Sequence, residues 1–137
     1  ASRNMKYMLD TDICSYAIRS AFPVLAARLA QTNKRDACIS VISYGELLVG
    51  AEKSEARNKM FDGIERIIQF LHVMPLDEDV ASIYAETRAN LEIKGTPIGG
   101  NDIWIGAHAL SLGLTLVTNN VREFKRIPKL KVENWTK

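Results

Sequence analysis

Oxygen-bearing side chains stand where short apolar runs give way to longer helical patterns. Asp10 follows the run YML directly, Glu46 lies about one helical turn beyond the run CISVI, and Asp102 ends the segment GTPIGGND. The run LTLVT is followed at once by Asn119 and Asn120. If the runs are parallel strands, their carboxyl ends share one edge of a sheet, and these side chains could face one cavity.

Such a group of carboxylates repels itself unless a cation compensates its charge. Carboxylate and water oxygens suit Mg²⁺, with Mn²⁺ as a substitute. Zinc is not expected, because His72 and His108 stand far apart and no Cys/His ligand spacing accompanies them. A magnesium ion held by a few carboxylates keeps several waters and a place for a phosphate oxygen. The pattern therefore favours metal-dependent hydrolysis of phosphoesters.

Most of these polar residues also have an ordinary structural interpretation. Asp10 or Asp12 could cap one helix and Asp102 another, because short acidic side chains accept hydrogen bonds from free N–H groups at helix N-termini. Asn119 and Asn120 could be turn residues.

Glu46 is harder to explain in this way. It lies in one of the most apolar parts of the chain, and no Lys or Arg occurs between Asp36 and Gly50. A partly buried carboxylate needs a cationic partner, which could be a distant basic residue or a bound metal ion. We interpret His108 as a helix-surface residue or a support of the site and not as a ligand.

Short β-like runs alternate with helical patterns along the chain. We expect strands at 7–9, 38–42, 73–76 and 114–118, with a weak last strand around Val132. Their continuous apolar character predicts strands covered on both faces. Apolar stripes at helical spacing run through 60–71 and 80–91, Pro23 fits the first turn of a short helix, and Gly95 follows a helix end. The alternation predicts an α/β sandwich with a mainly parallel sheet.

Size and composition set the broad class of the protein. The 137 residues, 47% of them hydrophobic, predict one domain over residues 5–137. Residues 1–4 precede the first methionine and are expected to be a cloning remnant. No apolar run reaches the roughly 18 residues of a membrane span, so a cytoplasmic protein without a membrane partner is expected. Cys14 and Cys38 are expected to be reduced core residues.

Basic residues gather in the segment VREFKRIPKLK. The net charge of +2 does not by itself indicate a nucleic-acid partner, but this segment carries five basic residues against the single acid Glu123. A run of this kind is most often a solvated face.

Three segments in this order resemble a known family: YMLDTDI, then CISVISYGELLVGAEKS, then GTPIGGNDIWIGAHALSLGLTLVTNNVREFKRI. They closely resemble the PIN-domain ribonucleases and, more narrowly, the VapC toxins of bacterial toxin–antitoxin pairs. The resemblance covers nearly everything from Met5 to the C-terminus. Its specificity lies in the ordered set of motifs, because LDT alone is weak.

The resemblance implies a three-layer α/β/α fold and a Mg²⁺- or Mn²⁺-dependent endoribonuclease. It assigns the metal-binding catalytic acids to Asp10, Glu46 and Asp102, and a fourth catalytic position to Asn120. Supporting positions fall on Thr11, Asp12, Thr118 and Glu123.

The departure from the family pattern is at Asn120, where many PIN domains carry aspartate. Because an amide brings no charge, a second metal ion would be held more weakly, and a one-metal arrangement becomes plausible. Asp12 also varies, since many relatives have asparagine there, and we interpret it as a helix cap or a support of the site.

The same resemblance implies substrates and partners. The substrates would be structured RNAs, often tRNA anticodon regions or ribosomal RNA loops, cut to leave a 5′-phosphate and a 3′-hydroxyl. Arg122, Lys125 and Arg126 would contact RNA phosphates. The protein would form homodimers and be inhibited by a VapB-type antitoxin, and a surface around Met60 and Phe61 could contribute to either interface, although both residues fit a core role better.

Two alternatives remain open on the sequence. LDTDIC superficially matches the Asp-x-Asp signature of haloacid-dehalogenase-type phosphohydrolases, with Asp10 as the nucleophile and Asp12 as the acid. That family also needs a later acidic pair, which is missing here because Asn101 precedes Asp102. The second alternative is a PIN-like scaffold that binds a partner or RNA without cutting, and the retained Asp10, Glu46 and Asp102 argue against it.

Overall fold

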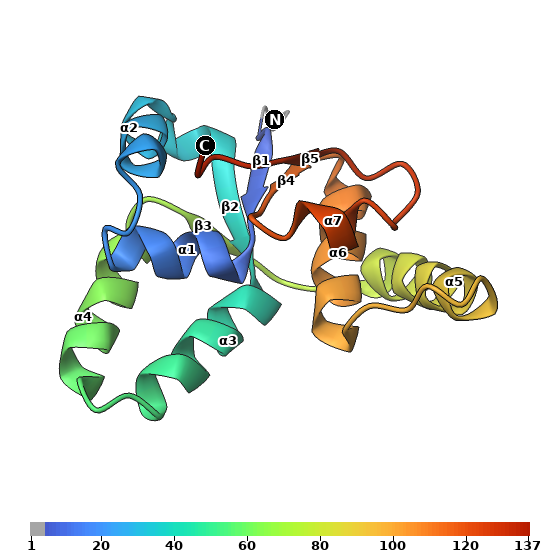
Figure 1. The fold of residues 1–137 in the computed structure, drawn as a ribbon, viewed down its shortest axis with the longest axis horizontal. Helices are drawn as coiled ribbons and strands as arrows, with labels where there is room; N and C mark the ends of the chain where they lie inside the picture. The colour runs from blue at the N-terminus through green and yellow to red at the C-terminus, as the bar shows by residue number, and fades with distance from the viewer. Residues whose placement is uncertain (1–4) are drawn as a thin grey trace.

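The computed structural model describes residues 5–137, so the expectation for residues 1–4 lies outside the described part of the chain (Figure 1). The strands are β1 (Tyr7–Leu9), β2 (Ala37–Ser40), β3 (His72–Met74), β4 (Thr115–Val117) and β5 (Val132–Glu133). The helices are α1 (Thr11–Ile18), α2 (Pro23–Gln31), α3 (Val41–Glu52), α4 (Arg57–Ile68), α5 (Glu78–Ile93), α6 (Gly100–Leu112) and α7 (Val121–Phe124), and a 3₁₀ turn spans Lys34–Asp36.

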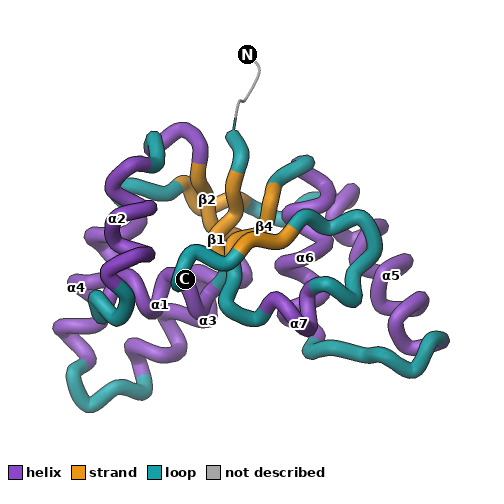
Figure 2. Tube along the Cα trace, turned by 45° about the horizontal axis from the view of Figure 1, so that its top comes forward, coloured by secondary structure: helices purple, strands orange, loops and turns teal. Residues whose placement is uncertain are grey.

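The strands form one sheet in the order β3-β2-β1-β4-β5, and every neighbouring pair is parallel. Helices α1 to α4 lie on one side of this sheet and α5 to α7 on the other (Figure 2). The predicted three-layer α/β/α architecture with a parallel sheet is confirmed.

Alternating strand residues divide the core into two clusters. Leu9 of β1 and Val117 of β4 face the layer of α1 to α4, whereas Met8 and Leu116 face the layer of α5 to α7. All four side chains are fully buried. Successive strand residues point to opposite faces, so a parallel sheet covered on both sides needs an apolar residue at every position. This explains the continuous apolar runs.

β4 ends one residue earlier than the sequence predicts, and β2 and β3 each end two residues earlier, for local reasons. β2 stops at Ser40 because the Ser40 hydroxyl accepts a hydrogen bond from the Ile42 N–H at 3.1 Å and caps α3. β3 stops at Met74, directly before Pro75, which has no N–H to donate to a neighbouring strand. The prediction for β1 is confirmed residue for residue.

The helix ends follow ordinary capping rules. Asp10 caps α1 by accepting the Thr11 N–H, and Pro23 occupies the first turn of α2 as predicted. Gly113 ends α6 in the left-handed conformation, with φ of 69°, which glycine adopts without strain.

Over residues 5–137, no single helix combines the length and hydropathy needed to cross a bilayer; α1 and α2 pass that test only as a pair bent by 102°. Cys14 and Cys38 are free and buried. Met60 and Phe61 are partly buried and pack against the core beneath α4, so their core role is confirmed.

Candidate active site

The candidate site begins at the point where the strand order reverses. The chain moves from β1 through β2 to β3 and then returns to the other side of β1 with β4. In open parallel sheets, a crevice is expected at such a reversal, beyond the carboxyl ends of the two strands, here β1 and β4. Asp10 follows β1, is 5% exposed, and its backbone N–H donates to the Val117 carbonyl at 2.8 Å. The Thr118 hydroxyl donates to Asp10 Oδ2 at 2.7 Å, and the Thr11 N–H donates to Oδ1 at 2.8 Å. Both carboxylate oxygens of Asp10 are therefore fixed.

The two residues after Thr118 hold two further acids. The Asn119 N–H donates to Asp12 Oδ2 at 3.1 Å, and Asn120 Nδ2 donates to Glu123 Oε1 at 3.0 Å. We call Thr118, Asn119 and Asn120 the 118–120 turn. Each of its three consecutive residues orients a different carboxylate.

Glu46 enters the same site from the first turns of α3. It is half-buried, and its Oε1 accepts a hydrogen bond from the Thr11 hydroxyl. Its Oε2 accepts one from Asn101 Nδ2 at 3.1 Å. Because Asn101 directly precedes Asp102 in the first turn of α6, these contacts connect the helices that carry Glu46, Thr11 and Asp102.

The carboxylates perturb one another electrostatically. Burial, followed by the charges of Asp12 and Asp102, raises the pKa of Asp10 to about 7. Burial also raises the pKa of Asp12. The pKa of Asp102 is raised to about 6 by burial first and then by the charges of Glu46, Glu123 and Asp12. Five acids from four segments of the chain therefore share one electrostatic environment.

No cation of the described chain neutralises this group. The ion pairs found in residues 5–137 involve Glu52, Glu92 and Glu133, all outside the site. Asp12 Oδ1 is buried, and no residue in the described range 5–137 gives it a hydrogen-bond partner. An all-oxygen donor set with excess negative charge fits a hard divalent ion such as Mg²⁺. In the part of the chain that the structure describes, however, no three His, Cys, Asp or Glu side chains already stand in coordinating positions.

His108 is buried and not on a helix surface, which corrects one of the two interpretations made from sequence. It is 1% exposed, and its Nδ1 lies 2.8 Å from Ser40 Oγ. The ring also donates to the Pro75 carbonyl, and burial lowers the pKa of His108, which favours the neutral imidazole. His108 thus joins α6, which carries Asp102, to the N-terminus of α3, which carries Glu46.

Replacing His108 with alanine should lower the free energy of unfolding by about 2 kcal/mol or more, because the change leaves a cavity and removes the ring's hydrogen bonds. Urea unfolding followed by circular dichroism measures the effect. His72→Ala, at an exposed position of β3, is the control and should be near neutral. Equal urea midpoints for the two variants would contradict the joining role of His108.

The basic residues predicted to contact RNA lie on or just after α7. Arg122, Lys125 and Arg126 are all exposed. Arg126 also donates to the Pro97 carbonyl at 3.0 Å, which ties the segment after α7 to the loop before α6. Their role toward RNA stays a prediction.

The structure brings the predicted acids and supports together, although it assigns them no chemistry. Asp102 does not cap α6, since Gly99 holds that position, whereas Asp10 both caps α1 and lies in the site. The sequence interpretation missed the parts played by Asn119 and Asn101. Their adjacency to Asn120 and Asp102 was the available signal.

Comparison with known proteins identifies the family. The PIN domain family model matches residues 7–130. The chain belongs to the PIN-domain family. Curated relatives of this PIN domain include Ribonuclease VapC1 of Haemophilus influenzae, 38% identical over 97% of this chain and 100% of that protein. Another is the tRNA(fMet)-specific endonuclease VapC of Salmonella typhimurium, 41% identical over 96% of this chain and 98% of that protein. The PIN domain described here is thus of the VapC type.

Solved structures agree with this assignment. The PIN domain superimposes on a chain of VapBC2 from Rickettsia felis, bound to a DNA fragment from its promoter, with a TM-score of 0.90 and 39% identity. That match covers 96% of this chain and 99% of the other. VapBC-1 from nontypeable Haemophilus influenzae gives a TM-score of 0.87 with 38% identity, over 97% of this chain and 100% of the other. Family membership favours the nuclease over the haloacid-dehalogenase alternative.

Proposed function

We propose that this chain is a metal-dependent endoribonuclease toxin that hydrolyses phosphodiester bonds in structured RNA. The observation that carries the proposal is the convergence of Asp10, Glu46 and Asp102 near the carboxyl ends of β1 and β4, with no basic side chain paired to them among the described residues.

In this proposal Asp10, Glu46 and Asp102 hold Mg²⁺, or Mn²⁺ in its place. When bound, the ion would supply a water of lowered pKa and stabilise negative charge on the phosphate. Thr118 keeps the Asp10 carboxylate in one orientation, and Asn120 keeps Glu123 beside Asp102.

To bind the ion, Glu46 would have to give up one of the hydrogen bonds that its carboxylate accepts. Its two oxygens are engaged by Thr11 and Asn101, which explains why the acids do not yet stand in coordinating positions. Asn120 is the fourth catalytic position, and its neutral amide favours a single ion over two.

The relatives suggest the substrate class and the partners. One is named as specific for tRNA(fMet), and the solved relatives are VapBC assemblies. We therefore infer an unpaired loop of tRNA or ribosomal RNA as the substrate, a VapB-type antitoxin as the inhibitor, and a homodimer as the toxin's own assembly. Exposed Arg122, Lys125 and Arg126 would contact the RNA backbone.

The test is to incubate the purified chain with total RNA and map the new 5′ ends. We expect Mg²⁺-dependent cuts in loops, bearing 5′-phosphates, which disappear with EDTA and in the Asp102→Asn variant. Binding of RNA without any cutting would favour the non-catalytic scaffold, and a phosphorylated Asp10 would favour the phosphohydrolase.

A further inference from the structure

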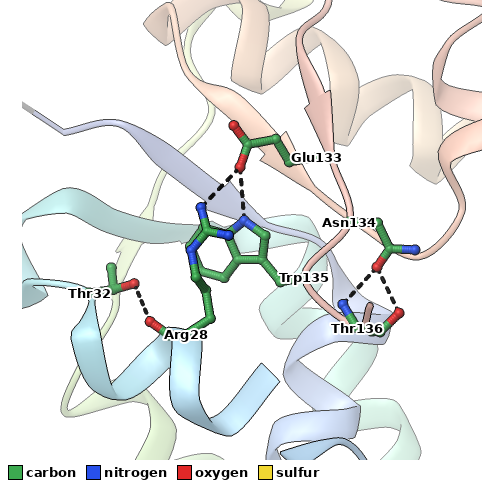
Figure 3. A network of polar contacts seen from close by, with 6 residues as sticks. All are labelled: Arg28, Thr32, Glu133, Asn134, Trp135 and Thr136. Carbon is green, nitrogen blue, oxygen red and sulfur yellow. Dashed lines mark hydrogen bonds and ion pairs between the residues drawn. The ribbon is translucent and has the colours of Figure 1, made fainter. Parts of the chain in front are cut away.

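The C-terminal segment lies against the 118–120 turn. β5 pairs with β4, and the Thr118 N–H donates to the Glu133 carbonyl at 2.9 Å, which extends this pairing to the edge of the site. Beyond β5, Asn134 Oδ1 accepts hydrogen bonds from the Thr136 N–H at 2.9 Å and the Thr136 hydroxyl at 2.8 Å (Figure 3). The segment 134–136, which we call the C-terminal clip, is thereby folded back on itself.

Trp135 anchors the clip to the domain. Its indole is 1% exposed and meets the Tyr7 ring edge-on at a centroid distance of 4.9 Å. The Arg28 guanidinium lies over the indole at 4.4 Å, and the indole N–H donates to Glu133 Oε1 at 2.9 Å (Figure 3). A buried tryptophan with a satisfied N–H is fixed in position. The residues on either side of it are held as well.

Asn134 and Thr136, the neighbours of Trp135, both contact one atom of the 118–120 turn. Asn134 Nδ2 donates to Asn119 Oδ1 at 3.0 Å, and the Thr136 hydroxyl lies 3.3 Å from the same oxygen. On its other side, Asn119 Nδ2 donates to the Tyr16 hydroxyl at 3.4 Å. Asn119 itself is exposed, so these side-chain contacts, and not burial, restrain it.

The backbone of Asn119 passes this restraint to the acids. Its N–H donates to Asp12 Oδ2 at 3.1 Å, while Asp12 Oδ1 is buried and has no hydrogen-bond partner among residues 5–137. Asp12 lies in the first turn of α1, whose N-cap is Asp10, and its negative charge acts on both Asp10 and Asp102. The orientation of Asp12 therefore affects the charge environment of both.

We propose that the C-terminal clip is a positioning element of the active site, in which Asn134 and Thr136 fix Asn119 so that its backbone N–H orients Asp12. This inference rests on the proposed metal-dependent function. Groups that orient a metal site from outside the ligands commonly change metal affinity or activity by about 10- to 100-fold when removed. A clip that served only to close the sheet edge would change stability alone.

The test compares Asn134→Ala and Thr136→Val with Asn33→Ala as the matched control. Asn33 Oδ1 accepts a hydrogen bond from the Arg35 N–H, as Asn134 Oδ1 does from the Thr136 N–H. Asn33 is exposed and caps the 3₁₀ turn, so it is not part of the C-terminal clip. Three measurements are made on the whole chain: exchange of the Asn119 amide proton by NMR without metal, Mn²⁺ affinity by electron paramagnetic resonance, and kcat and KM for an RNA oligonucleotide.

For Asn134→Ala we expect faster exchange of the Asn119 amide, Mn²⁺ affinity weakened by about 10-fold, and a similar fall in kcat with KM for RNA within about twofold. Thr136→Val should act in the same direction and less strongly, because it removes the longer contact. In an Asp12→Asn background, Asn134→Ala should change kcat by less than about twofold, since the clip acts through Asp12.

Unchanged exchange and Mn²⁺ affinity in Asn134→Ala, or effects no larger than those of Asn33→Ala, would overturn the inference. A variant whose only change is a lower melting temperature would also overturn the inference. If the wild type binds Mn²⁺ but cuts no RNA, the proposed function fails, and the clip is then judged on amide exchange and Mn²⁺ affinity.

Discussion

Asp10→Asn should reduce RNA cleavage by at least about 10³-fold while the fold stays intact. Asp10 is the most buried of the site acids and has both oxygens oriented by Thr11 and Thr118. The amide keeps an acceptor for the Thr11 N–H, so the cap of α1 survives, but it removes the charge that would bind the cation. Single-turnover cleavage of an RNA oligonucleotide measures the loss, and far-ultraviolet circular dichroism checks the fold.

Asp62→Asn is the matched control for this change. Asp62 is an exposed carboxylate in the middle of α4, away from the crevice, and the variant should cleave like the wild type. Cleavage by Asp10→Asn within tenfold of the wild-type rate would remove Asp10 from the machinery. It would also leave the acid cluster without a chemical role.

Without metal, the protein should become less stable as the pH rises from about 4 to about 7. The pKa of Asp10 is about 7 in the folded chain and 3.8 in the unfolded one, so the folded chain binds more protons between these values. Stability falls with pH wherever the folded state is the more protonated one. At about 1.4 kcal/mol per pKa unit, the full loss from Asp10 is at most about 4 kcal/mol, and Asp102, with a pKa of about 6, adds to it in the same direction.

Urea unfolding in EDTA at a series of pH values measures this slope. Asp10→Asn should flatten the curve and be more stable than the wild type at pH 8, because it carries no buried charge there. Adding Mg²⁺ at pH 8 should raise the wild-type midpoint and leave that of Asp10→Asn nearly unchanged. A wild-type stability that rises between pH 4 and 7 relative to Asp10→Asn would contradict the raised pKa.

The sequence predicted the sheet and the meeting of the acids well, because both follow from strand periodicity and parallel topology. Strands covered on both faces must be apolar throughout, and their carboxyl ends must share an edge. The sequence alone could thus place Asp10, Glu46 and Asp102 at one edge of the sheet. The exact ends of β2 and β3 could not, because they depend on the cap at Ser40 and on Pro75.

The supporting contacts were much less predictable. Asn119 orients Asp12 through its backbone N–H, which every residue except proline has, so side-chain identity carries no signal. The partners lie 107 positions apart in the chain. The link between His108 and Ser40 was not predictable either, because it depends on how α6 packs beside the end of β2.

The 118–120 turn has a consequence for how this region can change. Its three residues contact Asp10, Asp12 and Glu123 in strict succession, two through side chains and one through the backbone. Many substitutions at the middle position would keep the backbone contact, whereas a single inserted or deleted residue would misalign all three pairings together. Natural variation here should therefore conserve loop length, and position 119 should keep a side chain that accepts hydrogen bonds from Asn134 and Thr136.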